Sequence, residues 1–451
     1  MAVVYFHPLL GALLIVLAFI SFYRPVYAIS LLFLFLPIDL VRPILSGIHV
    51  SFSEFELAVT AFSWCLGVTL RKERICLAPI LWILPYLGVV FFSGVINRGL
   101  MEAIAHTIRN SELMVGLILA VNIFAGEKNF PQARFAIGSA AVLYSFVGFF
   151  QVSAETRVSS FFHNSNQFGA YINILLPFCW AIALTANNRK TRLSYLFITC
   201  FLVVAQLLTM SRGSFLSMSM ILIVVFLIQF NRFKKVIGLG RDFPFWKCIK
   251  IVSAHLILLC LLLPALALVI PNLRPIDRMA NFSQRIRNVI ESRSLDDRTM
   301  ALEIGTKLWL ISPIIGLGPG NYHRAITKYV EDAPDWLKIH AHNQYLQLAI
   351  DFGLLGLVAA IYLFSRLTGW LVKSFLRHSS HSSLRDLEAG GLGLIIGLFI
   401  HGFVDEILSN HAMEIGLLLG MSLARMGMID RKNFFSLNMN FFSSKTWKVA
   451  R

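Results

Sequence analysis

Apolar runs of roughly 20 residues recur along most of the 451-residue chain. A run of this length spans the hydrocarbon core of a bilayer as an α-helix. Strands of a membrane barrel would alternate apolar and polar residues instead, and these runs do not alternate. The pattern therefore predicts an all-α, polytopic membrane protein with about 12–13 transmembrane helices. The expected segments are 8–22, 26–46, 55–70, 77–96, 112–125, 134–153, 168–186, 194–210, 214–230, 251–270, 345–372, 387–407 and 412–428.

The composition supports this class and excludes a soluble domain. Hydrophobic residues make up 57% of the chain and charged residues 14%, against about 45–50% and about 25% in soluble proteins. The net charge of +16 does not indicate nucleic-acid binding, because Lys and Arg concentrate in connectors between apolar runs, as expected of cytoplasmic loops. These basic connectors are 71–74, 189–192, 232–250, 373–385 and the tail from 431.

Alternation across the membrane then places 97–111, 154–167, 211–213, 271–341 and 408–411 outside. We therefore divide the chain into N-terminal transmembrane helices (1–154), central helices (155–270), a long periplasmic loop (271–341), C-terminal helices (342–430) and a cytoplasmic tail (431–451).

No cofactor or metal is expected from the sequence. The six cysteines have no metal-ligand spacing, and none lies in the long outer loop. The first seven residues lack a basic region and a small-residue cleavage site, so we expect no cleaved signal peptide.

The long outer loop is rich in arginine, in contrast to the other outer connectors. Arginine suits bidentate recognition of phosphate or carboxylate, although an amphipathic helix on anionic headgroups would also carry it. Arg298 differs from the others because it begins a periodic apolar stretch that ends at Ser312-Pro313, so a helix can hold it in place. The following Gly316-Leu317-Gly318-Pro319-Gly320 lacks the Lys and Ser/Thr of a P-loop. We interpret it as a tight turn that brings Arg298 towards His342.

The loop ends in Ile339-His340-Ala341-His342-Asn343, immediately before an apolar segment. Histidine exchanges a proton near neutral pH, so His342, and with it His340, is a candidate for activating a hydroxyl. The alternative is a capped helix start, in which Asn343 or His342 supports the first turn.

Two shorter outer sites carry further candidates. Arg212 lies between two apolar segments, where an arginine must face protein, water or an anion, or else snorkel to the headgroups. His163 and Asn166 precede a helix and could either hydrogen-bond a sugar or cap that helix. Within the last part of the chain, His401 and Asp405 are four residues apart, which favours a structural pair on one helix face.

Taken together, these pieces resemble the O-antigen ligase and polymerase superfamily of bacterial inner membranes. The resemblance covers about 163–405, and the order of the motifs makes it specific. The matching pieces are Phe162-His163-Asn164-Ser165-Asn166, Ser211-Arg212-Gly213, Arg298 with Trp309, Pro313 and Gly316-Leu317-Gly318, then His342-Asn343-Gln344-Tyr345-Leu346, Gly353-Leu354-Leu355-Gly356 and His401-Gly402-Phe403-Val404-Asp405. One departure is Asp351, where the family often has glutamate.

The resemblance implies a membrane-embedded glycosyltransferase that needs neither metal nor nucleotide. Such enzymes move a glycan from an undecaprenyl-diphosphate carrier, on the periplasmic side of the inner membrane, to a sugar hydroxyl. By the same resemblance His342 activates the acceptor, and Arg212 and Arg298 hold the diphosphate. Further possible substrate contacts, from their residue types and positions, are His340, Asn343, His163 and Asn166. Besides membrane lipids, the expected partners are the lipid-linked donor and a glycan acceptor.

Three functions remain open from the sequence. A ligase would use lipid A-core as the acceptor, whereas an O-antigen or exopolysaccharide polymerase would use another carrier-linked repeat unit. We favour the ligase. A transporter or flippase of a lipid-linked anion is the alternative from another class, but such proteins place their site near the bilayer midplane, often within inverted repeats. Here the arginines concentrate in an outer loop, and we find no repeat.

Overall fold

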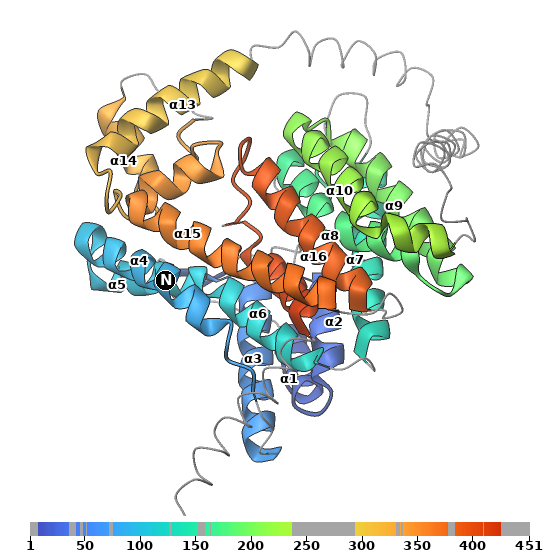
Figure 1. The fold of residues 1–451 in the computed structure, drawn as a ribbon. Helices are drawn as coiled ribbons and strands as arrows, with labels where there is room; N and C mark the ends of the chain where they lie inside the picture. The colour runs from blue at the N-terminus through green and yellow to red at the C-terminus, as the bar shows by residue number, and fades with distance from the viewer. Residues whose placement is uncertain are drawn as a thin grey trace, which may run out of the picture.

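The computed structural model describes residues 8–35, 42–45, 48–50, 52–71, 75–125, 129–151, 158–162, 164–236, 294–330, 334, 337–377, 384–408 and 410–424. Almost all of these residues are helical (Figure 1). The helices are α1 (Pro8–Tyr23), α2 (Pro25–Phe35), α3 (Phe52–Arg71), α4 (Ile80–Arg98), α5 (Leu100–Asn110), α6 (Glu112–Ile123), α7 (Phe130–Phe150), α8 (Ser165–Thr185), α9 (Arg189–Thr209), α10 (Arg212–Val236), α13 (Ser294–Ile311), α14 (Tyr322–Tyr329), α15 (Gln344–Arg377) and α16 (Leu384–His401), followed by Ala412–Ala424.

Seven helices in the described part of the chain are long and apolar enough to cross a membrane, and Pro25–Leu34 and Ala412–Ala424 are shorter apolar helices. The structure thus confirms an all-α, multi-pass membrane protein. The expected segment 251–270, the first part of the long loop and the tail 431–451 lie outside the described residues, so the count of 12–13 spans stays a prediction.

One expectation for the N-terminal third is wrong. The apolar segment 26–46 is not one helix: α2 ends at Phe35, and β1 (Arg42–Leu45) pairs antiparallel with β2 (Ile48–Val50). Pro37 accounts for the early end, because the residue before a proline avoids the helical conformation. The connector 97–111, expected outside the membrane, is mostly helical, since α5 begins directly after Gly99 (φ 90°).

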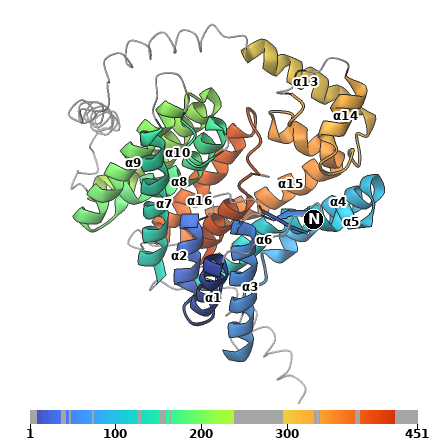
Figure 2. The same cartoon turned by 180° about the vertical axis from the view of Figure 1, so that it is seen from behind.

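A bundle around α8 forms the main body of the protein, and α9, α10 and α16 pack against this helix (Figures 1 and 2). The side chains of α8 are buried along its whole membrane-spanning window. Glycines on one face of α16 allow the close packing: a Cβ at Gly393 would come within 2.5 Å of Val225, and one at Gly390 within 2.4 Å of Phe178. Small residues in this role are typical of helix packing in membranes.

The helix α15 is interrupted at Gly353, whose φ of 64° and ψ of −162° are not helical. The break leaves backbone groups without partners in the helix, and the glycine-rich segment supplies them. Leu317 and Gly318 donate N–H groups to the carbonyls of Ile350 and Asp351 at 2.7 and 3.0 Å. In return, Pro313 and Ile314 accept from Leu354 and Leu355 at 2.8 and 3.2 Å. The expected tight turn therefore serves as a backbone clamp on the broken helix.

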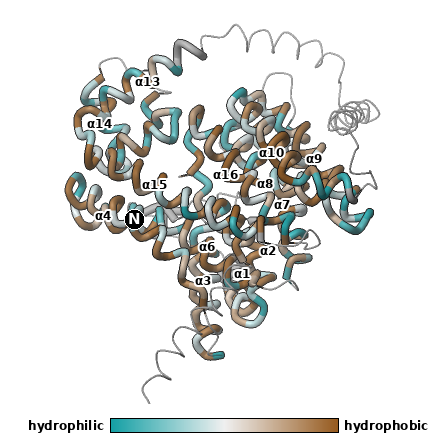
Figure 3. The backbone as a smooth tube through the Cα atoms, in the orientation of Figure 1, coloured by the Kyte–Doolittle hydropathy of each residue, from teal (hydrophilic) through white to brown (hydrophobic). Residues whose placement is uncertain are grey.

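This clamp fixes α13 beside the first half of α15, at the edge of the molecule where polar and apolar residues mix (Figure 3). A small separate core joins the two helices, with Leu308 and Ile350 fully buried in it. Gly305 lies beside Leu346 and Ile350, and Pro313 lies beside Leu354, so α13 runs parallel to the first half of α15. Arg298, about two turns before Gly305, therefore lies beyond the start of α15.

Candidate active site

Asn343 caps the start of α15. Its Oδ1 accepts the backbone N–H groups of Tyr345 and Leu346, both at 3.0 Å, which satisfies donors that a helix start leaves without partners. The capping interpretation is therefore confirmed for Asn343, whose Nδ2 also donates to the carbonyl of Phe403 at 3.3 Å. The next residue, Gln344, accepts from the backbone of Ile407 and Leu408 through its Oε1 at 2.9 and 2.7 Å. These contacts attach the start of α15 to the turn that follows α16.

The histidines precede this cap in a strained turn. His342 has a φ of 50°. This backbone conformation is unfavourable for residues other than glycine, and such strain is often found at functional sites. Its N–H donates to Nδ1 of His340 at 3.1 Å, and the two ring centroids are 4.1 Å apart. The Ala341 N–H donates to Oε1 of Gln347 at 2.9 Å, and Nε2 of Gln347 donates to Asp351 at 3.0 Å. Hydrogen bonds therefore hold the turn on both sides.

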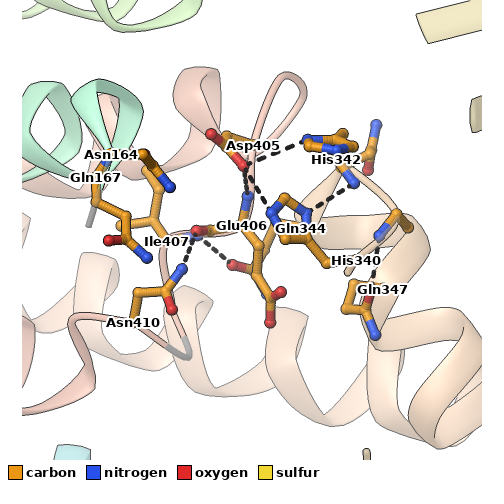
Figure 4. A network of polar contacts seen from close by, with 12 residues as sticks. Asn164, Gln167, His340, His342, Gln344, Gln347, Asp405, Glu406, Ile407 and Asn410 are labelled. Carbon is orange, nitrogen blue, oxygen red and sulfur yellow. Dashed lines mark hydrogen bonds and ion pairs between the residues drawn. The ribbon is translucent and has the colours of Figure 1, made fainter. Parts of the chain in front are cut away.

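Asp405 faces this pair of histidines (Figure 4). Its Oδ1 lies 3.8 Å from Nε2 of His340 and 4.0 Å from Nδ1 of His342. α16 ends at His401 and the chain turns there, so Asp405 lies outside the helix. The expected pairing of Asp405 with His401 stays a prediction. The His401 ring is buried, and its Nδ1 lies 3.4 Å from Nδ2 of Asn173.

His340, His342 and Asp405 are close enough together to raise the question of a metal site. One ligand atom from each of His340, His342 and Asp405 lies within 4.8 Å of the other two. However, Nδ1 of His340 accepts the N–H of His342, so a neutral His340 ring carries its hydrogen on Nε2. The nitrogen nearest to Asp405 is then a donor, and it has no lone pair for a metal. In this tautomer His340 faces Asp405 with an N–H group, at 3.8 Å, a distance longer than a hydrogen bond.

Charge near the cluster affects both His340 and Arg298. Burial lowers the pKa of His340, the neighbouring His342 lowers it further, and Asp405 partly offsets this by raising it. His340 is therefore neutral near pH 7. Partial burial also lowers the pKa of Arg298, which Asp405 raises and Arg212 lowers. Arg298 therefore lies near both Asp405 and Arg212, which are far from it in the sequence.

Arg212 begins α10, immediately before Gly213. A Cβ at Gly213 would come within 2.2 Å of Val404, so the start of α10 packs directly on the turn that carries Asp405. The structure thus brings together four residues that the sequence singled out, namely Arg212, Arg298, His340 and His342.

The candidates near the start of α8 are separate from this cluster. His163 lies outside the described residues. Asn166 lies in the first turn of α8, and its neighbour Asn164 caps the helix by accepting the N–H of Gln167 at 2.9 Å. In Figure 4, Asn164 and Gln167 lie beside Asn410, and His342 lies on the other side of Asp405. A role of this segment in sugar binding stays a prediction.

Sequence reasoning missed Asp405 and Gln347 as neighbours of the histidines. The four-residue spacing predicted His401 as the partner of Asp405. Because α16 ends at His401, the side chain of Asp405 lies near His342. Gln347 had a local signal, since it lies four residues before Asp351 on the same helix.

The comparisons with known proteins cover the part of the chain that carries most of this cluster. Residues 197–361 match the family model described as O-antigen ligase. The match includes Arg212, Arg298 and both histidines. A comparison with curated proteins finds no match. The family implies a glycosyltransferase of the O-antigen ligase or polymerase type, with lipid-linked glycan substrates. Residues 197–361 are thus similar to the O-antigen ligase family, and the multi-pass helical fold agrees with this similarity.

Proposed function

We propose that this protein is an O-antigen ligase-type glycosyltransferase that moves a glycan from undecaprenyl diphosphate to a sugar hydroxyl of lipid A-core. The reaction takes place at the periplasmic face of the inner membrane and needs no metal. The observation that carries the proposal is the convergence of His342, Asp405, Arg212 and Arg298 at the ends of α15, α16, α10 and α13. A proton acceptor thus lies beside cations that suit a diphosphate.

His342 acts as the general base. With Nδ1 facing Asp405, the favoured tautomer carries its hydrogen on Nδ1, and Nε2 is then the atom that takes the proton from the acceptor hydroxyl. Asp405 orients the ring and stabilises it once it is charged, as the carboxylate does in a catalytic triad. The distance of 4.0 Å shortens when substrate is bound, since such contacts often tighten only in the substrate complex.

The acceptor oxygen then attacks the anomeric carbon of the donor sugar. A new carbon–oxygen bond forms, and the bond from that carbon to the diphosphate breaks. The diphosphate leaves with the electron pair, still attached to the carrier lipid. Arg212 and Arg298 stabilise the negative charge that develops on it, and fixed cations in a partly buried site do this effectively. His340 and Asn343 border the acceptor side of the site.

The test is transfer by the purified protein in vesicles, with an undecaprenyl-diphosphate-linked glycan as donor and lipid A-core as acceptor. We expect a product that combines the glycan with lipid A-core. Joining of two donor glycans in place of this product would reassign the protein as a polymerase. Movement of the donor across the bilayer without any transfer would indicate a flippase. The surface glycans of a deletion strain give an independent check, because a missing ligase leaves long chains on the carrier and none on lipid A-core.

A further inference from the structure

The turn that follows α13 is held between α4 and α15, two helices that are long and apolar enough to cross a membrane. On one side, the Leu355 N–H of α15 donates to the Ile314 carbonyl at 3.2 Å. On the other side, Oγ of Ser93 in α4 donates to the Ile315 carbonyl at 2.9 Å. Ser93 lies about 7 Å before the end of α4 at 1.5 Å per residue, so the turn is level with a part of α4 that lies inside the span.

The break at Gly353 indicates where the membrane begins on α15. From Leu354 to Arg377 this helix is about 36 Å long at 1.5 Å per residue, which already exceeds the hydrocarbon core of about 30 Å. The part before the break is therefore not needed to cross the bilayer, and it carries the polar Gln347 and Asp351 beside the histidine turn. Hydrocarbon thus begins near Leu354, and the turn that pairs with this residue lies at the same level.

The exposed side chains at the end of α13 and in this turn are apolar. Leu310, Ile311 and Ile314 are 62%, 45% and 61% exposed, and we call these three residues the apolar tip. Leu354 on α15 and Ile96 on α4 are also exposed. Single exposed apolar residues are common on protein surfaces, but this group joins the apolar surfaces of two spanning helices.

The polarity of α13 changes within one turn of the apolar tip. Glu303 and Lys307, whose side chains are exposed, form an ion pair at 2.7 Å. Leu310 follows Lys307 by less than one helical turn. Between them, Trp309 donates its Nε1–H to the Pro313 carbonyl at 3.1 Å, and tryptophan is enriched where a membrane meets water. The end of α13 thus has the order of residues expected of a segment that passes from water into the surface of a bilayer.

We propose that the apolar tip inserts into the leaflet on the side of the histidine site and holds α13 at a fixed height above the bilayer. Helices at a membrane interface bury their apolar faces by about 5–10 Å, which agrees with the level of Ser93 on α4. Lipid is favoured over a protein partner because the tip continues the apolar surfaces of α4 and α15 at the level where hydrocarbon begins. The insertion needs only the multi-pass fold, so it goes beyond the proposed function.

The length of α13 gives this insertion a consequence for the site. Arg298 precedes Leu310 by about 18 Å along the helix. With one end in the leaflet and clamped to α15, α13 acts as a spacer that sets the distance of Arg298 from the bilayer. A donor anchored in the bilayer by its lipid presents its diphosphate at a fixed height, so this distance decides whether the two meet. This consequence, unlike the insertion, rests on the proposed function.

The first test measures the insertion directly. A nitroxide spin label is attached at Ile314→Cys in the full chain without its native cysteines, reconstituted in vesicles of phosphatidylethanolamine and phosphatidylglycerol. Its collisions with oxygen, which concentrates in lipid, are compared with its collisions with a water-soluble nickel chelate. Glu303→Cys on the same helix is the aqueous reference, and Val358→Cys, exposed on α15, is the lipid reference. We expect oxygen to dominate at positions 314 and 358 and the nickel chelate to dominate at position 303.

Two results would overturn the insertion. Dominance of the nickel chelate at position 314 would place the tip in water, and a label there that neither reagent reaches would show that a second copy or another protein covers it. The wild-type chain gives an independent readout through a phospholipid with a photoreactive diazirine near its headgroup. We expect labelled peptides from 308–315, and labels in 354–361 without any in 308–315 would equally contradict the insertion.

The second test concerns the height of Arg298. Ile314→Asp places a charge in the leaflet without disturbing a buried contact, so it should lower the rate of transfer severalfold, whereas Ile314→Leu should restore it. Thr327→Asp adds the same charge to the exposed face of α14 and is the matched control. Wild-type transfer by Ile314→Asp would overturn the role of α13 as a spacer. Absence of transfer in the wild type itself would refute the proposed function, and the spin label would still decide the insertion.

Discussion

The two ends of α16 each place one carboxylate among basic groups, and the two sites differ in how completely that carboxylate is satisfied. At the first turn, Asp386 is fully buried and accepts from Arg232 at 2.7 Å, Arg134 at 2.9 Å and Thr185 at 2.7 Å. After the last turn, Asp405 lies 3.8 and 4.0 Å from two partly buried histidines.

The difference separates a structural role from a chemical one. Asp386 joins the ends of α7, α8 and α10 to α16, and its short contacts leave no room for a ligand. Removing one partner from a buried ion pair of this kind leaves an unpaired charge in the interior and strongly destabilises the fold. The contacts of Asp405 with the histidines are longer than hydrogen bonds, and Arg298 lies close enough for Asp405 to raise its pKa and for Arg212 to lower it. A site of this kind can still accept a substrate.

The largest effect should come from removing the base at the Asp405 end. His342→Ala is expected to lower the rate of transfer by about 10²–10⁴-fold, the usual contribution of a general base, with donor binding largely kept. Transfer in vesicles and photolabelling by the donor measure the two separately. His323→Ala is the control, since this histidine is exposed on α14 and its ring lies 3.0 Å from the Lys338 carbonyl. Near-normal turnover of His342→Ala, with His340→Ala inactive, would move the role of base to His340.

At the opposite end of α16, Asp386→Ala should reduce stability. Two arginines, Arg134 and Arg232, would lose their carboxylate, and removing one partner of a buried ion pair typically costs about 3–5 kcal/mol. Thermal unfolding in detergent measures this loss. Asp405→Asn should show the reverse pattern, with a small change in unfolding temperature and a large loss of transfer. Similar unfolding temperatures for both variants would contradict the assignment of a structural role to Asp386 and a chemical role to Asp405.

A moderate effect is expected from lysine at the proposed diphosphate clamp. Arg298→Lys and Arg212→Lys keep the charge but lose the bidentate fork. One lost hydrogen bond to a charged group costs about 1.5–3 kcal/mol, which corresponds to roughly ten- to a hundredfold in donor affinity. Arg324→Lys on the exposed face of α14 provides the control. The donor affinity of each variant is measured by titration, at unchanged expression. Equal affinity for all three variants would leave the clamp without support.

A smaller effect should follow from loosening the histidine turn. Gln347→Leu removes the acceptor of the Ala341 N–H and the partner of Asp351. The loss of one neutral hydrogen bond is worth about 0.5–1.5 kcal/mol, so kcat should fall severalfold while KM stays constant, because the arginines still hold the donor. Gln347→Glu keeps the acceptor for Ala341 but places a carboxylate beside Asp351. A change in KM alone would show that Gln347 contacts the substrate and does not position the histidines.

Removing divalent metal ions with a chelator is expected to leave the rate of transfer unchanged. If the cluster at Asp405 works as a His–Asp pair, excess EDTA should leave transfer unchanged. Loss of activity on chelation that Zn²⁺ or Mn²⁺ restores would indicate that His340, His342 and Asp405 are metal ligands. Metal analysis of the purified protein by mass spectrometry gives a second readout.

The sequence by itself determined the membrane class, most of the helices and the residue types of the site. Burial of an apolar run in a bilayer is a local requirement, so run length and spacing alone predicted helices such as α4 and α9. The helix from about Arg298 to Ser312 and the capped start at Asn343 were equally local. Arg212, Arg298 and His342 stood out because polar residues next to apolar runs need a partner or a role.

The tertiary structure alone decided which of these residues meet. The partners of Asp405 depend on α16 ending at His401, and no spacing rule shows that end. The break at Gly353 is stable only because the Pro313–Gly318 segment pairs with the exposed backbone, a contact between residues about 35 positions apart. The position of the apolar tip of α13 likewise depends on its contacts with α4 and α15. Local patterns report what each segment must bury, whereas partners depend on how distant segments pack, and that packing is set by all of the helices together.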